Sequence, residues 1–417
     1  MARPGCEDEP DKGRVLVVAA RPVGGGGGNR AGPTRSGGAD GGADGGADRG
    51  AGAVDLVVVA QRQFRGPVYA AAGLDGRVAV AVGSKLHVLR LAARGAPPRL
   101  EVETTHAGQV LSLYLDVRRD PAPAAPAGAG GGAADDADDA AGAAAAAATA
   151  GIGAWTVVVG DLMRSLTTLT WQPPAPSAAS AAGDPPRADP AGPPEAGQAR
   201  LLERAHDFQT AWPTAILARP GGVALSADTH GNLCALRDSA WPGRGGGAQA
   251  PGAGRLPPCR LVRASEIHWG EVANRLRPGS LVPRRGGGGG AEGEGEGGAT
   301  ASVGGDGGDG GVPGPVVAGC VSGALLLLVP LSPADHASLD RLQRVMGEIP
   351  GVGGLRWGPW RRPRADAGDA RRRGCIDGDL LEGFLDLPPA ERRDLAEQAG
   401  EDPARLTALL EDLSAQH

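Results

Sequence analysis

Two small polar clusters are the first candidates for residues of this chain that could carry out chemistry. Asp377 and Asp379 flank Gly378, and two carboxylates at this spacing could bind a divalent cation. At the start of a predicted helix the same residues would be an N-cap and a first-turn acid, which the helix dipole favours, and we prefer that interpretation. His268 and Glu271 could form an acid–base pair. A structural hydrogen bond at the end of a strand accounts for that pair better.

A third candidate is the arginine-rich segment from Arg361 to Arg373. Such a run could contact the phosphates of a nucleic acid. Asp366 and Asp369 interrupt it and no aromatic residue accompanies it, which favours a solvated loop between domains. The candidate nucleic-acid contacts are Arg361, Arg362, Arg364, Arg371, Arg372 and Arg373.

No motif in the sequence indicates an enzyme. The glycine run at 24–30 lacks the Lys-Ser/Thr pair and the preceding strand of a phosphate-binding loop, and no HExxH or GxSxG motif occurs. The five cysteines are widely separated and form no CxxC pair, which argues against zinc and against a disulfide framework. We therefore expect no catalytic residues, no metal and no cofactor, and a reducing compartment.

Composition separates foldable from low-complexity sequence. Of 417 residues, 72 are Gly and 36 are Pro, and most of them lie in five tracts without hydrophobic periodicity. Such tracts cannot bury enough apolar surface to offset chain entropy, which predicts disordered insertions. The tracts are residues 24–53, 121–151, 173–198, 242–258 and 284–314. About 280 residues remain, enough for one large domain and one small domain.

Charge and hydropathy limit the classes of partner that this protein could have. The formal net charge is −6, so no global basic field indicates nucleic acid. The first 30 residues contain no apolar core of a signal peptide. The longest apolar run, Ala324–Leu331, is too short to span a membrane. We expect a soluble intracellular protein without a membrane partner.

The elements that would position these residues fall into two classes. Residues 14–331, after a short tail at 1–13, contain many short strand-like runs separated by glycine turns. The clearest is Trp155–Trp171, in which three consecutive valines precede a Gly160-Asp161 turn and a second apolar stretch. The two-residue turn Gly83-Ser84 predicts a hairpin. Repetition at four strands per unit predicts a partial β-propeller, although the WD dipeptide is missing.

After Leu331 the hydrophobic period changes to that of helices. Ser332-Pro333 and Asp402-Pro403 each pair a capping residue with a proline at the first helical position. A helix beginning at Pro389 should end at Gly400, and Asp377 is a predicted N-cap. Residues 332–417 should therefore form a small helical domain.

Six segments together resemble the C-terminal region of the large-subunit family of UV-damaged-DNA-binding complexes, the adaptors of cullin-4 ubiquitin ligases. They occur in the order of that family, with gaps at the low-complexity tracts. The segments are EPDKGRVLVV from Glu9, VLSLYL from Val110, VVVGDLMRSLTTL from Val157, HDFQTAWPTA from His206, IHWGEVANRLRPGSLV from Ile267 and GCIDGDLLEGFLDL from Gly374. The sister families, the large subunit of the cleavage and polyadenylation specificity factor and a splicing factor 3b subunit, share this C-terminal domain.

The resemblance implies a fold and an interaction face. In the family, three seven-bladed propellers precede a helical domain, and apolar and aromatic side chains of the third propeller help to grip substrate receptors. The matching receptor-binding positions here are Leu111, Leu113, Tyr114, Arg164, Trp212 and Asn274. By residue type alone, Tyr114, Trp212 and Trp269 would most often be core residues, with a surface anchor as the alternative. His206 and Ala211 differ from the usual residues of the family.

The matching part covers only the later blades of the third propeller and the helices, so cullin docking is not carried over. Four or five blades cannot close a seven-bladed ring, and an open ring exposes strand edges. We expect either a truncated gene product or half of a split assembly. The missing propeller domains, or another partner, would then close the ring.

The expected function is a non-enzymatic scaffold that presents substrate-receptor proteins in a ubiquitin ligase acting in DNA repair and protein turnover. The expected location is the nucleus, with the cytoplasm as a second site. The alternative is a nucleic-acid-binding subunit of pre-mRNA cleavage and polyadenylation or of splicing. Nucleic-acid contact under the scaffold interpretation would be indirect.

Overall fold

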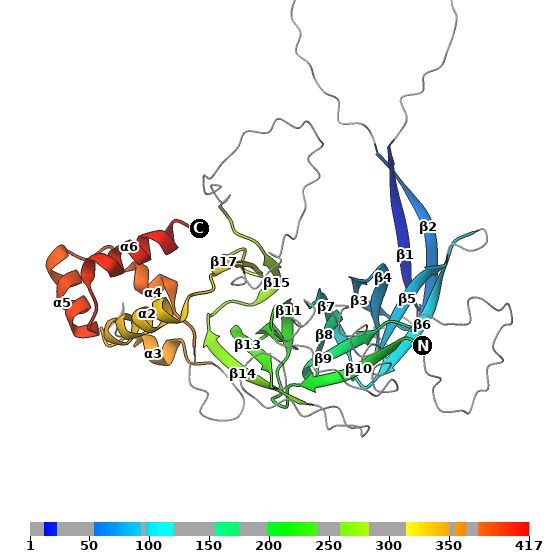
Figure 1. Ribbon diagram of the computed structural model, residues 1–417, viewed down its shortest axis with the longest axis horizontal. Coiled ribbons are helices and arrows are strands. Elements are labelled where there is room, and N and C mark those ends of the chain that lie inside the picture. Colours follow the sequence, from blue (N-terminus) through cyan, green and yellow to red (C-terminus); the bar gives the residue numbers. More distant parts are fainter. Residues whose placement is uncertain are drawn as a thin grey trace, which may run out of the picture.

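The structure is a computed structural model in which a β-rich body is followed by a cluster of helices (Figure 1). It describes residues 12–22, 54–92, 97–120, 155–174, 198–239, 259–282, 314–349, 354, 356–363 and 374–416. The five low-complexity tracts lie almost entirely outside these residues. The prediction that the tracts are disordered therefore concerns residues outside the described ones.

The β-rich body consists of blades of antiparallel strands. The first blade contains β3 (Val68–Leu74), β4 (Arg77–Val82), β5 (Lys85–Ala92) and β6 (Arg99–Ala107). The second contains β7 (Ser112–Arg119), β8 (Trp155–Asp161), β9 (Ser165–Gln172) and β10 (Arg200–His206). The third contains β11 (Pro213–Arg219), β12 (Val223–Asp228), β13 (Asn232–Asp238) and β14 (Cys259–His268). The fourth has three strands, β15 (Ala273–Pro278), β16 (Val316–Cys320) and β17 (Leu325–Leu328).

The first strand of each blade is its inner strand, and these inner strands lie around a common axis. The neighbouring pairs β3–β7, β7–β11 and β11–β15 are in contact, so the inner strands of successive blades follow one another around an axis. At the outside, the second and third blades join where β10 pairs in parallel with β14 through Ala205–Cys259 and His206–Arg260. This is the arrangement of a propeller, and it confirms the fold class predicted from the sequence.

Apolar layers fill the space between blades. Val157, Leu169 and Trp171 of the second blade pack against Leu86 and Val88 of the first. The opposite face of the second blade packs against the third, and the third packs against the fourth. Central strands buried on both faces explain why the sequence reads as continuous valines and leucines there rather than as alternation.

An additional hairpin covers the outer face of the first blade. It is formed by β1 (Lys12–Pro22) and β2 (Val54–Arg65). Val15 and Ala60 are buried against Val80 and Leu89 of that blade. The hairpin extends beyond the blades as a two-stranded ribbon (Figure 1).

The helical domain contains α2 (Pro333–Met346), α3 (Trp357–Trp360), α4 (Gly378–Glu382), α5 (Pro389–Ala399) and α6 (Pro403–Ser414). Its core surrounds Phe384 and includes Leu339, Leu342 and Leu406. Ser332 and Asp402 accept hydrogen bonds at their helix N-termini, as predicted, and Gly400 ends α5 in the left-handed conformation. Among the described residues no helix is long and apolar enough to cross a membrane.

Four strands were not anticipated from the sequence. They are β6, β10, β14 and β15, three of which are rich in charged residues. Three of these strands, β6, β10 and β14, are the outermost strands of their blades. Outer strands need little apolar patterning, so their sequences carry a weak signal.

Candidate functional site

The six predicted receptor-binding residues lie at one end of three successive blades. Leu111 precedes β7, and Leu113 and Tyr114 lie near its beginning. Trp212 immediately precedes β11, and Asn274 is the second residue of β15. Arg164 is in the β8–β9 turn, and this turn is at the same end because Ser112 pairs with Asp161. We call this end of the second to fourth blades the loop face.

Asp161, at the end of β8, organises the loop face. Its carboxylate is fully buried and accepts backbone hydrogen bonds from two separate segments. Oδ2 accepts from the amides of Val110 at 2.7 Å and Leu111 at 2.8 Å. Oδ1 accepts from the amides of Met163 at 2.8 Å and Arg164 at 2.9 Å. One side chain therefore fixes the loop before β7 to the β8–β9 turn, which the sequence indicated only as a turn position.

Arg164 strengthens the same connection. Its guanidinium donates to the carbonyl oxygen of Gly108, and the amide of Leu162 donates to the carbonyl of Leu111 at 3.0 Å. Arg164 is half-buried and helps to hold the loop. Its charge thus lies beside the exposed side chains of both segments.

A bulge occurs near the beginning of each of the four inner strands. The pairing register shifts by one residue around Tyr69, Leu113, Thr214 and Asn274. A bulge leaves the extra residue unpaired and changes the direction of its side chain. Two of the predicted site residues, Leu113 and Asn274, occupy this repeated position. Tyr69 and Thr214 occupy it in the other blades, and sequence reasoning did not select them.

Tyr114 lies deeper than its neighbours. It packs against the apolar layer between the second and third blades, and burial raises the pKa of its hydroxyl. The strand opposite provides space through Gly160, because a Cβ there would lie 3.1 Å from the Cβ of Tyr114 and 3.3 Å from Ile216. Tyr114 therefore supports the loop face from below, whereas Trp269 joins the layer between the third and fourth blades.

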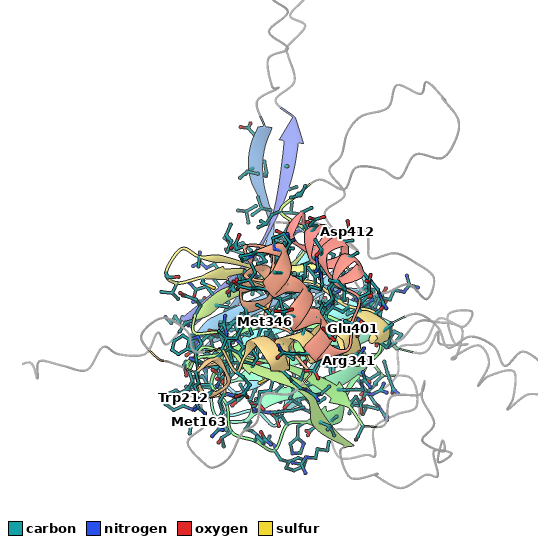
Figure 2. The ribbon with its side chains drawn as sticks, turned by 90° about the vertical axis from the view of Figure 1, so that its left-hand side faces the viewer. Met163, Trp212, Arg341, Met346, Glu401 and Asp412 are labelled. Atoms are coloured by element: carbon teal, nitrogen blue, oxygen red, sulfur yellow. The ribbon has the colours of Figure 1, made fainter. Side chains whose placement is uncertain are left out.

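Exposed apolar side chains gather on the loop face. Trp212 is 51% exposed, which favours the surface-anchor interpretation over the core interpretation. Val110 and Met163 are each 53% exposed and Phe208 is 59% exposed. Figure 2 shows Met163 and Trp212 on the same side of the molecule. Val110, Met163 and Phe208 were not selected from the sequence, since only the fold reveals which turn residues remain uncovered.

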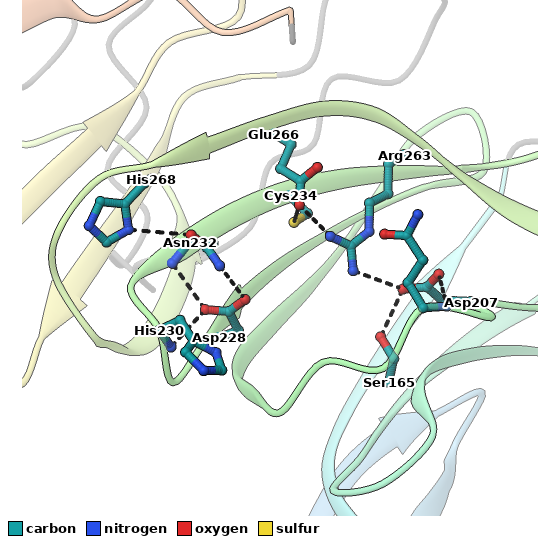
Figure 3. Close-up of polar contacts among 10 residues, drawn as sticks. Ser165, Asp207, Asp228, His230, Asn232, Cys234, Arg263, Glu266 and His268 are labelled. Carbon is teal, nitrogen blue, oxygen red and sulfur yellow. Dashed lines mark hydrogen bonds and ion pairs between the residues drawn. The ribbon is translucent and has the colours of Figure 1, made fainter. Parts of the chain in front are cut away.

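The third blade contains an aspartate at the position of Asp161. The carboxylate of Asp228, at the end of β12, accepts from the amide of His230 at 2.9 Å and from the amide and side chain of Asn232. Asn232 Oδ1 lies 3.3 Å from His268 Nδ1. Figure 3 marks this contact with a dashed line. His268 is thus part of a buried structural network, and Glu271 accepts from Ser322 Oγ at 2.6 Å.

Arg361 connects this network to the helical domain. Its backbone carbonyl accepts from the amide of His268 at 3.1 Å, and its guanidinium donates to the carbonyl of Trp269 at 3.0 Å. The guanidinium also binds Asp377 through Nε–Oδ2 at 2.6 Å and a second contact at 3.0 Å, and Asp379 at 3.2 Å. Arg361 therefore forms a buried ion pair with Asp377 inside the helical domain, and its contacts with His268 and Trp269 connect that domain to the blades.

Asp377 stands at the N-cap position of α4, as predicted, but its side chain makes no capping hydrogen bond. The prediction that it caps the helix was wrong because Arg361 and the indole of Trp357 occupy both carboxylate oxygens. Asp379 is in the first turn, as expected. Of the other candidate phosphate contacts, Arg362 is exposed, whereas Arg364, Arg371, Arg372 and Arg373 lie outside the described residues.

The described residues contain no group of three or more His, Cys, Asp or Glu side chains that could hold a metal ion. Cys234 is buried beside Glu266, and burial raises the pKa of its thiol well above the usual value. A thiol in that state is a poor nucleophile at neutral pH. What the loop face offers is apolar side chains on rigid turns, which is the chemistry of a protein interface.

Comparison with known proteins gives a match to one family model. Residues 195–386 match the family described as the CPSF A subunit region. That match includes the third and fourth blades and much of the helical domain.

Particular relatives extend the similarity. The chain is 24% identical to DNA damage-binding protein 1a of Arabidopsis thaliana over 87% of its length, and 24% identical to DNA damage-binding protein 1 of Solanum lycopersicum over the same share. It is 23% identical to DNA damage-binding protein 1 of Oryza sativa subsp. japonica over 99% of its length. The chain spans about a quarter of these relatives, 25% to 27% of each. The resemblance to the C-terminal region of these proteins is thereby confirmed.

Proposed function

We propose that this chain is a non-enzymatic protein-binding scaffold, an adaptor-like component of a nuclear cullin-4-type ubiquitin ligase that presents substrate receptors on its loop face. The observation that carries the proposal is the set of exposed apolar side chains, above all Trp212, on turns that buried aspartates hold in place. Rigid aromatic anchors bind partners with little loss of conformational entropy. The names of the relatives, DNA damage-binding proteins, support a role in the response to DNA damage.

The bulged residues add to this face. Leu113 and Asn274 are matched positions of the family, and Tyr69 is an exposed aromatic residue at the corresponding place in the first blade. We infer that a bound receptor contacts several blades, since the inner strands that carry these residues are neighbours. Leu111, Tyr114 and Arg164 would mainly hold the shape of the surface.

We further propose that another β-sheet packs on the outer face of the β1–β2 hairpin. Leu16 and Val18 of β1 and Leu56 and Val58 of β2 are exposed there. An apolar strand face open to water favours association. Further propeller blades, on the same polypeptide or on a partner, fit this face.

The test is binding of receptor proteins from the source organism to the full chain. Trp212→Ala should weaken receptor binding by about 30- to 1,000-fold, the scale of an aromatic hot spot of about 2–4 kcal/mol. The free energy of unfolding should change by no more than about 0.5 kcal/mol, because the side chain is on the surface. Trp360→Ala, another exposed tryptophan on the helical domain, is the matched control and should leave binding unchanged.

The alternative, direct nucleic-acid binding, predicts a different result. Affinity for a labelled single-stranded RNA or DNA would then fall steeply with salt, and Trp212→Ala would matter little. Arg361 is held by two carboxylates and a carbonyl, which leaves it poorly placed to contact phosphate. We therefore expect receptor binding that depends on Trp212 and depends weakly on salt.

A further inference from the structure

A cavity of about 200 Å³ lies at the outer junction of the second and third blades. It is formed where β10 ends, after its short parallel pairing with the beginning of β14. Its lining residues are Asp207, Gln209, Arg260, Leu261, Val262 and Arg263. Asp207 and Gln209 belong to the loop that leads to Trp212, so the cavity lies beside the loop face.

Arg260 is the available cation of this cavity. Its guanidinium lies 5.7 Å from the centre of the Phe208 ring, and it is exposed. Within the described part of the chain no carboxylate lies within ion-pair distance of Arg260. The cation–π contact orients the guanidinium without neutralising its charge.

Arg263 is held rigidly at the inner side. It donates to Glu266 and to Asp207 Oδ2, the latter at 3.5 Å, while its buried Nε–H has no hydrogen-bond partner (Figure 3). Asp207 is itself fixed by Ser165 Oγ at 2.9 Å and by the amide of Gln209 at 3.0 Å. The carboxylate of Asp207 thus accepts from three donors, and the charge of Arg263 is shared between Asp207 and Glu266.

We propose that this cavity binds the carboxylate of an acidic side chain on a partner protein. A carboxylate would pair with Arg260, whose planar donors match it in geometry. The exposed Phe208 and Val262 would receive an adjoining apolar side chain of the same segment. The proposal rests on the scaffold function proposed above, and it adds an acidic residue to the chemistry of the partner.

A nucleic acid fits the cavity less well. The Phe208 ring already contacts the ring of His206, with centroids 3.9 Å apart, and the guanidinium of Arg260. The ring is still 59% exposed, so the small positive charge of the cavity, rather than a lack of stacking surface, disfavours a nucleic acid. A single unpaired arginine also provides little of the phosphate neutralisation on which nucleic-acid affinity depends.

The experiment observes the arginine side chains of the full chain directly. With ¹⁵N-labelled arginine, the Nε–H signals of Arg260 and Arg263 are assigned through Arg260→Lys and Arg263→Lys. The probes are acetyl-leucyl-glutamyl-leucinamide, its glutaminyl analogue and inorganic phosphate. We expect the glutamyl peptide to shift the Arg260 signal saturably, and the glutaminyl peptide to bind at least tenfold more weakly.

Controls separate this proposal from the proposed function. Arg260→Gln should weaken binding of the glutamyl peptide about tenfold, because one charged hydrogen bond is lost. Trp212→Ala should leave the peptide titration unchanged, so that failure of receptor binding and failure of the cavity are seen independently. Equal shifts from both peptides, no shift at Arg260, or binding of phosphate without the peptide would each overturn the proposal.

Discussion

Asp161 and Asp228 occupy the same place in two adjacent blades, yet they are connected to opposite parts of the molecule. Each ends the second strand of its blade and accepts backbone hydrogen bonds from the following turn. Asp161 also binds the loop before β7, beside the exposed residues of the loop face. Asp228 binds Asn232, which leads through His268 to Arg361 and the helical domain.

The difference shows how a repeated fold acquires local roles. In the second and third blades a buried carboxylate accepts from amides of this turn that would otherwise be unsatisfied, whereas Val82 and Cys320 stand at the corresponding positions of the first and fourth blades. What the second carboxylate oxygen binds is not fixed by the blade. In the second blade it stabilises a candidate binding surface, and in the third it supports the junction between domains.

Removing Asp161 should have the largest effect. Asp161→Ala leaves four backbone amides without an acceptor in a buried site, so we expect the free energy of unfolding to fall by about 4 kcal/mol. Hydrogen exchange should accelerate at the amides of residues 110, 111, 163 and 164. Asp161→Asn, which keeps the shape and one acceptor oxygen, should lose about half as much. Equal losses of unfolding free energy in the two variants would contradict the role of Asp161 as a hydrogen-bond acceptor for the two loops.

Breaking the domain junction comes next. Arg361→Gln leaves Asp377 as a buried carboxylate without its ion-pair partner, and we expect a loss of about 3 kcal/mol. Urea unfolding measures it, and limited proteolysis should show the helical domain released first. Arg393→Gln, on the exposed surface of α5, is the control and should be neutral. An Arg361→Gln variant as stable as this control would show that the guanidinium contacts of Arg361 do not hold the domains together.

Asp228→Ala should be less damaging than Asp161→Ala, at about 2 kcal/mol, because one of its three donors is a side chain that can reorient. Combining it with Asn232→Ala measures their coupling, which should exceed about 0.5 kcal/mol. If Asp228→Ala also increased hydrogen exchange at residues 110 and 111, the turns held by Asp161 and Asp228 would not be independent. That result would contradict the separate roles assigned to the two aspartates.

Asp116 provides the smallest and most specific test, since it joins the two blades directly. Its Oδ2 accepts from the amide of Ala218 at 2.7 Å, and burial raises the pKa of this carboxyl above its usual 3.8. A raised folded-state pKa favours the protonated native protein, so its contribution to stability is lost as pH rises through the raised pKa. Asp116→Asn should therefore gain stability relative to the native chain between about pH 4 and pH 7, by about 1 kcal/mol or less. Urea unfolding at both pH values checks the sign, and a relative loss by the Asn variant would contradict it.

Much of the fold followed from local signals in the sequence. Gly83-Ser84 gave the hairpin between β4 and β5, and Ser332-Pro333 gave the beginning of α2. These signals work because a turn or a cap depends on a few adjacent residues. The outer strands β6, β10 and β14 were not predicted from the sequence, because their pairing partners, rather than their own apolar residues, specify them.

The candidate site was predictable only in part. Segment resemblance selected Trp212 and Arg164, but the exposed Met163 and Phe208 and the bulges at Tyr69 and Thr214 depend on the register between strands. A one-residue shift of pairing changes which side chain is uncovered. No pattern in a single sequence records that shift.

By itself the sequence determined the all-β body and the helices that follow it, since strand and helix periodicity are properties of neighbouring residues. Only the tertiary structure decided that Asp161 would tie two loops together and that Asp377 would bind Arg361 instead of capping its helix. The physical reason is that a buried carboxylate takes the donors that the fold brings to it, and some of these donors lie far along the chain, 51 residues from Asp161 and 16 residues from Asp377.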